Sequence, residues 1–331
     1  MSDMRVQLAD MAEGLFADLA GAKFAEAWPQ LTEAGFAGLL VAEADGGFGG
    51  DWGDLYAVLR LAGLHALAAP LGETIIAHKL LADAGIERPE GAVGLAVAGA
   101  RVPFGRDCAA VLVADGGELR LYARDACAWD EGRAPQGEPR DRLTIIGTGT
   151  GAPLATFSSN HDVLALGAFA RVAQSAGALD AGFALAIDHV NARVQFGKPL
   201  AKFQAVQQAL ALASEHIAAV ACAGQAAAVA LDLGDASFEI AAAKLRTNLA
   251  IEAAVPVLHR VHGAIGFTIE YPLNHFTRRL MGWRGEFGND ALWARRLGAR
   301  VAGLGGAGLW REVTARGDRT GGDRTGGDRV A

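Results

Sequence analysis

The stretch RVQFGKPLAKFQ, residues 193–204, combines residue types that together can bind a phosphate group. Arg193 carries a permanent fork of N–H donors that matches phosphate oxygens. Gly197 lets the backbone come close to a ligand, and Pro199 can begin the next helix at little cost. Gln204 follows in the first turn of that helix, where free backbone N–H groups favour an anion. A turn between two helices with Arg193 in solvent explains the same residues, so the stretch alone leaves both interpretations open.

A second break, RVHGAIGFTIEYPLNHFTRRL at residues 260–280, places small residues at the end of a helix. Gly263, Ala264 and Gly266 permit either close packing or the approach of a ligand. Taken alone, this pattern is typical of a helix cap followed by a turn. The region that follows is locally basic, and we interpret it either as a surface that meets phosphates or an acidic partner, or as a solvated charged helix. Its arginines are Arg278, Arg279, Arg284, Arg295, Arg296 and Arg300.

Three segments of different pattern position these motifs. Residues 5–90 are predicted to be helical except for the loop EADGGFGGDWGD, because each Gly inside a helix costs up to about 1 kcal/mol. Residues 92–155 contain short apolar or alternating runs such as AAVLVAD and ELRLYA, which predict strands of a small sheet. Residues 160–310 return to helix, and their narrow Ala-lined faces suit an antiparallel bundle. The two clearest faces consist of Phe203, Val206, Leu210, Ala213, Ile217 and Val220, and of Val172, Ala176, Leu179, Phe183 and Val190.

The chain has 331 residues, of which 51% are hydrophobic, so it is long enough to bury a sizeable core. Its net charge of −7 argues against a general attraction to nucleic acid, which requires a basic surface. The three cysteines show no metal-binding spacing and predict no disulfide framework, and no Glu-x-x-His pair supports a di-iron bundle. The acidic N-terminus and the lack of an apolar run of about 20 residues predict a cytoplasmic protein without a signal peptide or membrane span. The repetitive end of the chain predicts a disordered tail over residues 311–331.

The two breaks, about 70 residues apart and in this order, resemble the acyl-CoA dehydrogenase family. ARVQFGKPLAKFQAVQQALA is similar to that family's Arg-x-x-Phe-Gly…Phe-Gln signature, and HGAIGFTIEYPLNHFTRR is similar to its Gly-Gly-x-Gly-Phe…Glu-x-Pro…Arg segment. LTEAGFAGLLVAEADGGFGG resembles its N-terminal Pro-Glu…Gly-Gly region, and the resemblance covers most of residues 25–300. Each motif alone is weak, whereas three in order are specific. Together they favour the phosphate-binding interpretation of Arg193.

The resemblance implies a mainly α fold with a small β domain. Its expected parts are an N-terminal helical domain at residues 1–91, a shortened β domain at 92–155 and a C-terminal antiparallel four-helix bundle at 156–310. The resemblance also implies FAD as the cofactor, an acyl-CoA substrate that is oxidised to the 2,3-enoyl-CoA, and an electron-transfer protein as the acceptor.

In this family FAD commonly lies across a subunit interface, where the signature Arg contacts the pyrophosphate. The Gly-Gly segment approaches FAD from the other subunit. We therefore expect an oligomer, built through the bundle, in which the segments near Arg193 and near Gly263 serve different subunits' sites. Carried over to this chain, the implied FAD-binding residues are Arg193, Phe196, Gln204, His262, Gly263 and Ala264.

The family's reaction requires a carboxylate that removes the α-proton while the flavin accepts hydride from the β-carbon. In most members this base is a Glu after the second motif, and at the ungapped position this chain has Phe287. Glu286, one residue earlier in WRGEFGND, is the candidate base, and a surface or structural carboxylate is the alternative. Other members place the base on the helix before the Arg signature, where this chain has Gly167.

The β domain also departs from the family, because the flavin-contacting motifs are not recognisable between Gly91 and Ala155. Short members of this kind occur in bacterial steroid degradation as one half of α2β2 acyl-CoA dehydrogenases. The resemblance therefore leaves two functions open. The first is an FAD-dependent acyl-CoA dehydrogenase, either as a homo-oligomer or in α2β2 with a full-length chain. The second is a non-catalytic partner subunit that completes the FAD sites of another chain.

Overall fold

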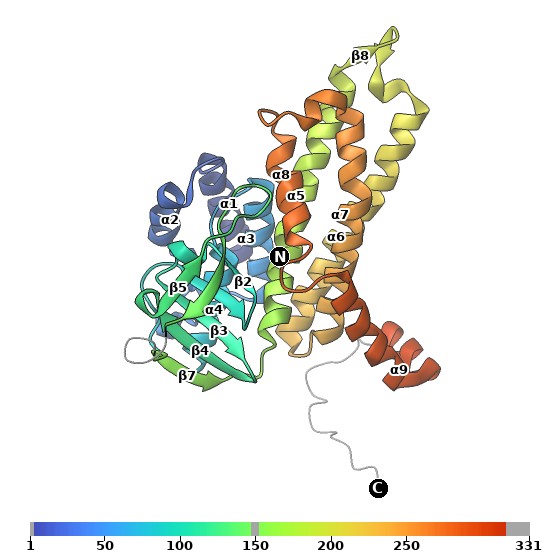
Figure 1. Cartoon of the computed structure of the whole chain (residues 1–331). Coiled ribbons are helices and arrows are strands. Elements are labelled where there is room, and N and C mark those ends of the chain that lie inside the picture. Colours follow the sequence, from blue (N-terminus) through green and yellow to red (C-terminus); the bar gives the residue numbers. More distant parts are fainter. Residues whose placement is uncertain (1–2, 147–151, 316–331) are drawn as a thin grey trace.

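The structure is a computed structural model that describes residues 3–146 and 152–315. Figure 1 shows three parts: a group of N-terminal helices, a small β domain beside them, and a long helical bundle. The prediction of a mainly α fold with a small β domain and a C-terminal bundle is confirmed.

The N-terminal part consists of helices joined by short turns. Its elements are α1 (Asp3–Asp18), α2 (Phe24–Glu33), α3 (Trp52–Leu64), α4 (Leu71–Asp83) and the 3-10 turns η1 (Phe36–Gly38) and η2 (Glu43–Asp45). A capping box starts α3: the N–H of Asp54 donates to Asp51 Oδ1 at 2.7 Å, and the N–H of Asp51 donates to Asp54 Oδ2 at 3.0 Å. The glycine-rich loop predicted at this point therefore ends where Asp51 begins the helix.

Close helix packing attaches this part to the long bundle helix α5 (Val163–Ala192). A Cβ on Gly177 would lie 1.8 Å from the carbonyl oxygen of Arg60, and a Cβ on Gly63 would lie 1.9 Å from that of Gln174. Because both residues lack a Cβ, the backbones of α3 and α5 approach each other directly. This contact fixes α3 against the middle of α5.

The β domain contains two small sheets. The first has the order β1-β3-β4-β7, with β1 parallel to β3 and the other pairs antiparallel, and the second is antiparallel with the order β2-β6-β5. The elements are β1 (Val93–Val97), β2 (Arg101–Pro103), β3 (Ala110–Asp115), β4 (Glu118–Ala123), β5 (Cys127–Asp130), β6 (Arg140–Ile145), β7 (Ala155–Ser158), η3 (Gly105–Asp107) and η4 (Arg124–Ala126). β1 and β3 are buried over most of their length, which explains their continuous apolar runs.

Four helices form the bundle, and a fifth follows it. Besides α5, they are α6 (Gln204–Leu233), α7 (Ser237–His262), α8 (Leu273–Trp283) and α9 (Asp290–Ala315), with β8 (Val194–Gln195), β9 (Lys198–Pro199), η5 (Leu200–Lys202) and η6 (Gly263–Phe267) between them. Asp162 caps α5 by accepting the N–H of Ala165 at 3.2 Å. The predicted apolar faces point inward, and their fully buried members are Leu210, Ala213, Ile217, Val220, Val172, Ala176, Leu179 and Val190.

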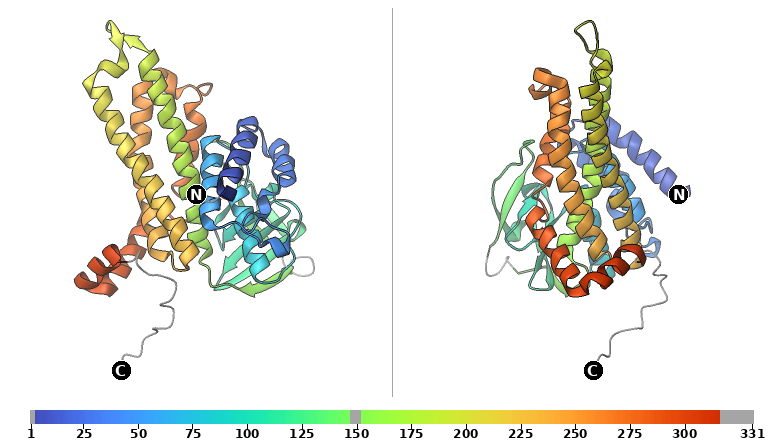
Figure 2. Two further views of the ribbon diagram at one scale, coloured as in Figure 1. Left: turned by 180° about the vertical axis from the view of Figure 1, so that it is seen from behind. Right: turned by 90° about the vertical axis from the view of Figure 1, so that its right-hand side faces the viewer.

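The two ends of the bundle differ. Both views in Figure 2 show the β8–β9 hairpin at one end and α9 at the opposite end. α9 bends at Gly305, where φ is +65°, and continues to Ala315. The predicted start of the tail at residue 311 is therefore wrong, because residues 311–315 are helical, while 316–331 lie outside the described residues. β7 likewise runs past the predicted domain boundary at residue 155.

One helix within the described ranges, α6, is long and apolar enough to cross a membrane by length and composition alone. Its hydropathy comes largely from its many alanines. α6 packs against α5 and α7 as a member of the bundle.

Candidate functional site

The connection between α5 and α6 forms an exposed hairpin. α5 ends at Ala192 and α6 begins at Gln204, close to the predicted bounds. Arg193 follows α5 directly, with its backbone N–H bonded to the carbonyl of His189 at 2.8 Å and its side chain exposed. Phe196 is 89% exposed and has a φ of +52°, a conformation that is strained for a bulky side chain. Its ring meets that of Phe203 edge-on, with the centroids 6.2 Å apart, and is otherwise open to solvent.

The second motif closes α7 with a buried histidine. His262 is 5% exposed, and its Nδ1 donates to the carbonyl of Leu258 at 2.7 Å. Its Nε2 has no hydrogen-bond partner within the described part of the chain. Gly263 has a φ of +65° and a ψ of −144°, a region that is essentially restricted to Gly. Ala264 is not among the residues with positive φ, so its backbone accepts Ala where the family often has Gly.

His189 connects the two motifs. Its ring centroid lies 4.7 Å from that of His262, and it precedes Arg193 by one helical turn. Burial, His262 and Arg193 together lower the pKa of His189, so its ring is neutral at neutral pH. The two segments therefore meet within one chain, and their expected assignment to different subunits' sites stays a prediction. They lie together at one end of the bundle, where Gln204 also begins α6, and can contribute to one site.

Glu286 lies in the loop between α8 and α9, and arginines bind both of its carboxylate oxygens. Oε1 accepts from Arg140 Nε at 2.6 Å, and Oε2 accepts from Arg171 Nε at 2.7 Å. Arg140 begins β6, whereas Arg171 lies within α5. This single carboxylate therefore joins the β domain to the bundle.

These contacts are the centre of an alternating chain of charges that we call the ion-pair network. At one end Glu73 of α4 pairs with Arg171. At the other end Arg140 Nη2 lies 3.4 Å from Glu138 Oε2, and Glu138 Oε1 lies 2.6 Å from Arg279 Nη2 of α8. No side chain of the network is more than 18% exposed. In spatial order its members are Glu73, Arg171, Glu286, Arg140, Glu138 and Arg279. Carboxylates and guanidinium groups alternate, so each buried charge is compensated.

The two arginines determine the acidity of Glu286. Burial alone would raise its pKa, but the charges and hydrogen bonds of Arg140 and Arg171 outweigh burial and lower the pKa to about 2. An efficient general base has a pKa near the working pH and an oxygen that can reach the proton. Glu286 lacks the first property, and both of its oxygens already accept hydrogen bonds from arginines. The geometry favours the structural alternative for Glu286 over the catalytic base that the resemblance implied.

The two positions at which the family places its base face each other in this fold. A Cβ on Gly167 would lie 2.2 Å from Cδ1 of Phe287, so the Phe287 ring fills the space beside α5. The guanidinium carbon of Arg171 lies 5.5 Å from the centroid of the same ring. Neither base position carries an ionisable group.

Lys244 is a buried cation beside this loop. It is 1% exposed, and its Nζ donates to the carbonyl of Trp283 at 2.7 Å and to Asn248 Oδ1 at 3.1 Å. Burial is the main cause that lowers its pKa to about 7. Lys244 thereby ties α7 to the end of α8, directly before the loop that carries Glu286.

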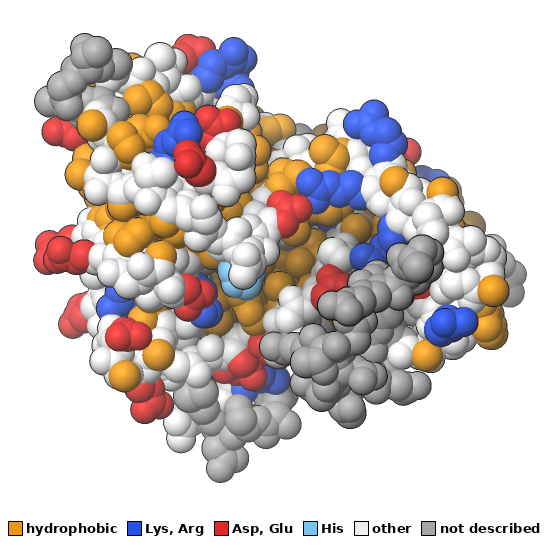
Figure 3. All heavy atoms as spheres, turned by 90° about the horizontal axis from the view of Figure 1, so that it is seen from below, with side chains coloured by type: hydrophobic (Ala, Val, Ile, Leu, Met, Phe, Trp, Pro, Cys, Tyr) orange, Lys and Arg blue, Asp and Glu red, His pale blue; other side chains and the backbone are white. Residues whose placement is uncertain are grey.

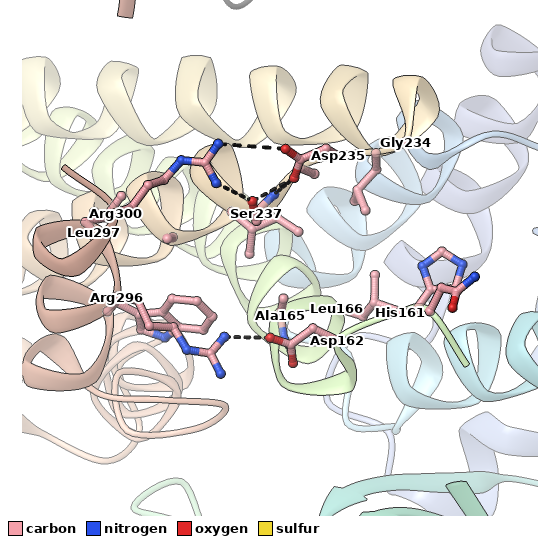
Figure 4. A pocket seen from close by; sticks show the side chains of 16 residues that line it. His161, Asp162, Ala165, Leu166, Gly234, Asp235, Ser237, Arg296, Leu297 and Arg300 are labelled. Atoms are coloured by element: carbon pink, nitrogen blue, oxygen red, sulfur yellow. Dashed lines mark hydrogen bonds and ion pairs between the residues drawn. The ribbon is translucent and has the colours of Figure 1, made fainter. Parts of the chain in front are cut away.

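Ion pairs within the chain account for most arginines of the predicted basic region. Figure 4 shows two of them: Arg296 lies 2.6 Å from Asp162, and Arg300 donates to Ser237 at 2.8 Å and lies 3.8 Å from Asp235. They line a cavity of about 250 Å³ between the starts of α5 and α7 and the helix α9. Figure 3 views the molecule from this end and shows charged side chains interspersed with hydrophobic ones. Since carboxylates balance these arginines, a phosphate-binding role for this surface is not supported.

Among the members of the ion-pair network, the sequence pattern singled out only Glu286 and Arg279 as candidate functional residues. Arg171 and Lys244 did leave a signal, because each lies among the buried residues of a mainly apolar helix. A charged residue is rarely buried without a partner. The pattern shows that a partner is needed, but it does not show which residue provides it.

A helical domain, a small β domain and a helical bundle, in this order along the chain, form the architecture that the sequence predicted. A family model described as acyl-CoA dehydrogenase, C-terminal domain, matches residues 157–302. This match places the bundle, residues 157–302, in the acyl-CoA dehydrogenase family.

Two curated relatives carry the same family name. The chain is 26% identical over 283 residues to acyl-CoA dehydrogenase IpdE2 of Mycolicibacterium smegmatis. The alignment covers 83% of this chain and 87% of IpdE2. It is 30% identical over 309 residues to acyl-CoA dehydrogenase FadE34 of Mycobacterium tuberculosis, covering 83% of this chain and 42% of FadE34.

Two solved structures share the fold. A chain of the steroid ACAD Tcur3481–Tcur3483 matches with a TM-score of 0.80 and 22% identity, covering 91% of this chain and 98% of that chain. A chain of the ChsE4–ChsE5 complex from Mycobacterium tuberculosis matches with a TM-score of 0.76 and 19% identity over the same shares of 91% and 98%.

Proposed function

We propose that this chain is the supporting subunit of a heteromeric, FAD-dependent acyl-CoA dehydrogenase. It binds part of FAD, and a full-length partner chain supplies the catalytic base for α,β-dehydrogenation of an acyl-CoA. The observation that carries this proposal is the position of Glu286 between Arg140 and Arg171. The only candidate base named from the sequence is thus committed to a structural contact.

The alternative base positions strengthen the proposal. Phe287 and Gly167 contact each other, and neither can take up a proton. With a pKa of about 2, Glu286 is a weak base while both arginine contacts remain, and it would gain basicity only by giving them up. That rearrangement would leave two buried guanidinium groups without their shared carboxylate.

The hairpin end of the bundle has the features that an FAD phosphate group requires. Arg193 presents an exposed guanidinium, and Gln204 is exposed at the first turn of α6. His262 adds a buried Nε2 that has no partner among the described residues, and a Cβ on Gly263 would meet nothing within 4 Å, so the backbone is open to a ligand. Phe196 offers an exposed ring for contact with the cofactor or the partner chain. FAD, when bound, supplies the hydride-accepting chemistry of the reaction.

The relatives are compatible with a heteromer. The similar chain of ChsE4–ChsE5 comes from a complex of two named proteins, and Tcur3481–Tcur3483 is a steroid ACAD with two named components. By analogy with these folds, we propose an α2β2 assembly and a steroid-derived acyl-CoA as the substrate class.

A flavin-bleaching assay tests the proposal. The purified chain, alone and mixed with full-length acyl-CoA dehydrogenase chains from the same genome, is treated anaerobically with a series of acyl-CoA thioesters. We expect bleaching only in the mixture, and we expect the mixture with E286Q to retain it. Circular dichroism of E286Q checks that the variant is folded.

The opposite result identifies a self-sufficient enzyme. Bleaching by the wild-type chain alone, reduced by about 10²–10⁴-fold in E286Q, would assign the base to Glu286 and reject the supporting role. Bleaching by the chain alone that survives E286Q would also reject it, because a base would then lie elsewhere in this chain.

A further inference from the structure

Two histidines lie directly before the two chain segments that we assign to the cofactor. His189 precedes Arg193 by one turn of α5, and its carbonyl accepts the backbone N–H of Arg193 at 2.8 Å. His262 ends α7 and directly precedes Gly263. The two imidazole rings stack, with centroids 4.7 Å apart and planes tilted by 31°. The stacked pair therefore connects the proposed phosphate contacts at Arg193 and Gly263.

Neither ring of the pair has a carboxylate partner. Glu13 with His65 is the one ion pair that a histidine makes within residues 3–146 and 152–315. The Nε2 of His262 is buried and has no hydrogen-bond partner in the same ranges. Tyr271 closes the far side of His262, with the ring centroids 5.0 Å apart. A proton on the pair therefore has no counter-charge among the described residues.

Titratable and charged groups lie on each element that packs around the pair. They are Asp188 and Arg193 on α5, Lys202 in η5, His259 on α7, Glu270 and Tyr271 before α8, and His275 on α8. Of these described groups, Arg193 is the cation that acts on His189: burial, His262 and then Arg193 lower the pKa of His189. Burial and then Asp188 raise the pKa of Tyr271, so this phenol stays neutral at neutral pH. His189 is therefore held neutral partly by the residue that we assign to the phosphate.

A phosphate group bound at Arg193 reverses the electrostatics at His189. Without an anion, the guanidinium of Arg193 disfavours a second positive charge one helical turn away. A bound anion cancels this repulsion and adds its own attraction, which half-buried groups feel with little screening by salt. Two charged imidazolium rings at 4.7 Å would repel each other, so the pair takes up one proton at most.

We propose that the stacked pair of His189 and His262 takes up one proton when a diphosphate group binds at Arg193, so that binding strengthens as the pH falls. The anion is the diphosphate of FAD, so this role rests on the proposed function. In the free chain the pKa of His189 lies below its ordinary value of 6.5, and the bound anion raises it. Between the two values the bound state holds more protons than the free state. Affinity therefore rises as the pH decreases through this window and is independent of pH above it.

Calorimetric titration with FAD at pH 6.5 and at pH 8.5 counts the protons. The flavin-free full chain is used, together with the partner chain from the bleaching assay where FAD binding requires it. Each titration is repeated in buffers with small and large enthalpies of ionisation, because the difference gives the protons taken up. The diphosphate of FAD is fully ionised at both pH values. We expect uptake of about 0.3–1 proton and about threefold or more higher affinity at pH 6.5, and about no uptake at pH 8.5.

Variants assign the proton to the pair. H189Q keeps a polar side chain that does not titrate, so it should lose the proton uptake and bind FAD at pH 8.5 within about threefold of the wild type. H161Q is the matched control. His161 precedes the opposite end of α5, and burial is the main cause that lowers its pKa too. H161Q should take up the proton like the wild type.

A measurement on the flavin-free full chain tests the coupling without a cofactor. In R193A the neighbouring cation is missing, so the titration midpoint of His189, followed by NMR of its imidazole, should rise by about 0.5 pH unit or more. Dephospho-coenzyme A, which carries a diphosphate but no flavin, distinguishes the source of the anion. It should cause no proton uptake.

Four results would overturn the inference while leaving the proposed function intact. They are FAD binding without proton uptake at pH 6.5, uptake that H189Q retains, an unchanged midpoint of His189 in R193A, and uptake with dephospho-coenzyme A but not with FAD. Absence of FAD binding at both pH values, with every partner chain tested, would reject the proposed function together with this role.

Discussion

The ring of Phe287 occupies the space directly in front of Gly167 on α5. A Cβ at residue 167 would come within 2.2 Å of Phe287 Cδ1, so the two residues are matched in size. Phe287 also has a φ of +51°, which its surroundings must stabilise. This pairing closes both positions at which the family places a catalytic base.

The pairing predicts strong coupling between the two residues. G167A should destabilise the chain by about 1–3 kcal/mol, because the added methyl group displaces the Phe287 ring. In G167A/F287A the methyl group has room, so the double variant should cost at least about 1 kcal/mol less than the sum of the single variants. Urea unfolding of the four proteins measures this coupling. G298A on α9, where a Cβ meets nothing within 4 Å, is the control and should stabilise the chain by up to about 1 kcal/mol, because Ala is the better helix former. Additive costs would contradict the pairing.

The ion-pair network predicts that Glu286 matters for stability. E286A should cost about 3–5 kcal/mol, because Arg140 and Arg171 would remain buried without their shared carboxylate. Glu252 provides a matched control, since it pairs with Arg284 at 2.9 Å but is 63% exposed. E252A should cost no more than about 1 kcal/mol. Chemical denaturation of both variants compares them, and equal costs would show that the network contributes nothing beyond a surface ion pair.

The burial of Lys244 predicts that the free energy of unfolding depends on pH in a specific way. Its folded-state pKa of about 7 lies below its ordinary value of 10.5, so between these values the unfolded chain binds more protons than the folded chain. Stability from this group is lowest below pH 7 and rises as the pH increases from 7 towards 10.5. K244M should remove this rise. The free energy of unfolding, measured from pH 6.5 to 9.5 for both proteins, tests the sign, and parallel curves would argue against it.

The proposed contact of Arg193 with an FAD phosphate group predicts that this residue affects the flavin content of the assembly. R193A should lower flavin affinity by about tenfold or more, because charge-assisted hydrogen bonds contribute about 1.5–3 kcal/mol each. Flavin absorbance per chain in the purified complex is the readout. K202A changes an exposed cation in the same connection and should retain flavin. Full flavin occupancy in R193A would remove this residue from the proposed site.

The sequence by itself determined the elements and the positions of the two breaks in the bundle. Short apolar or alternating runs predicted β3 and β4, and helical faces predicted α5 and α6, because burial imposes these patterns on any chain. The glycine and proline of the connection around Gly197 located the break between α5 and α6. These features depend on neighbours in the sequence, so they can be read without a structure.

Only the tertiary structure decided what Glu286 does. Its partners Arg140 and Arg171 lie 146 and 115 residues away in the sequence, on a strand and on a helix. A carboxylate one residue from the family's base position looks the same in sequence whether it is free or paired. Its pKa and its role follow from the charges that folding brings within about 3 Å of it. The same holds for His189 and His262, whose contact brings two motifs about 70 residues apart to the same end of the bundle.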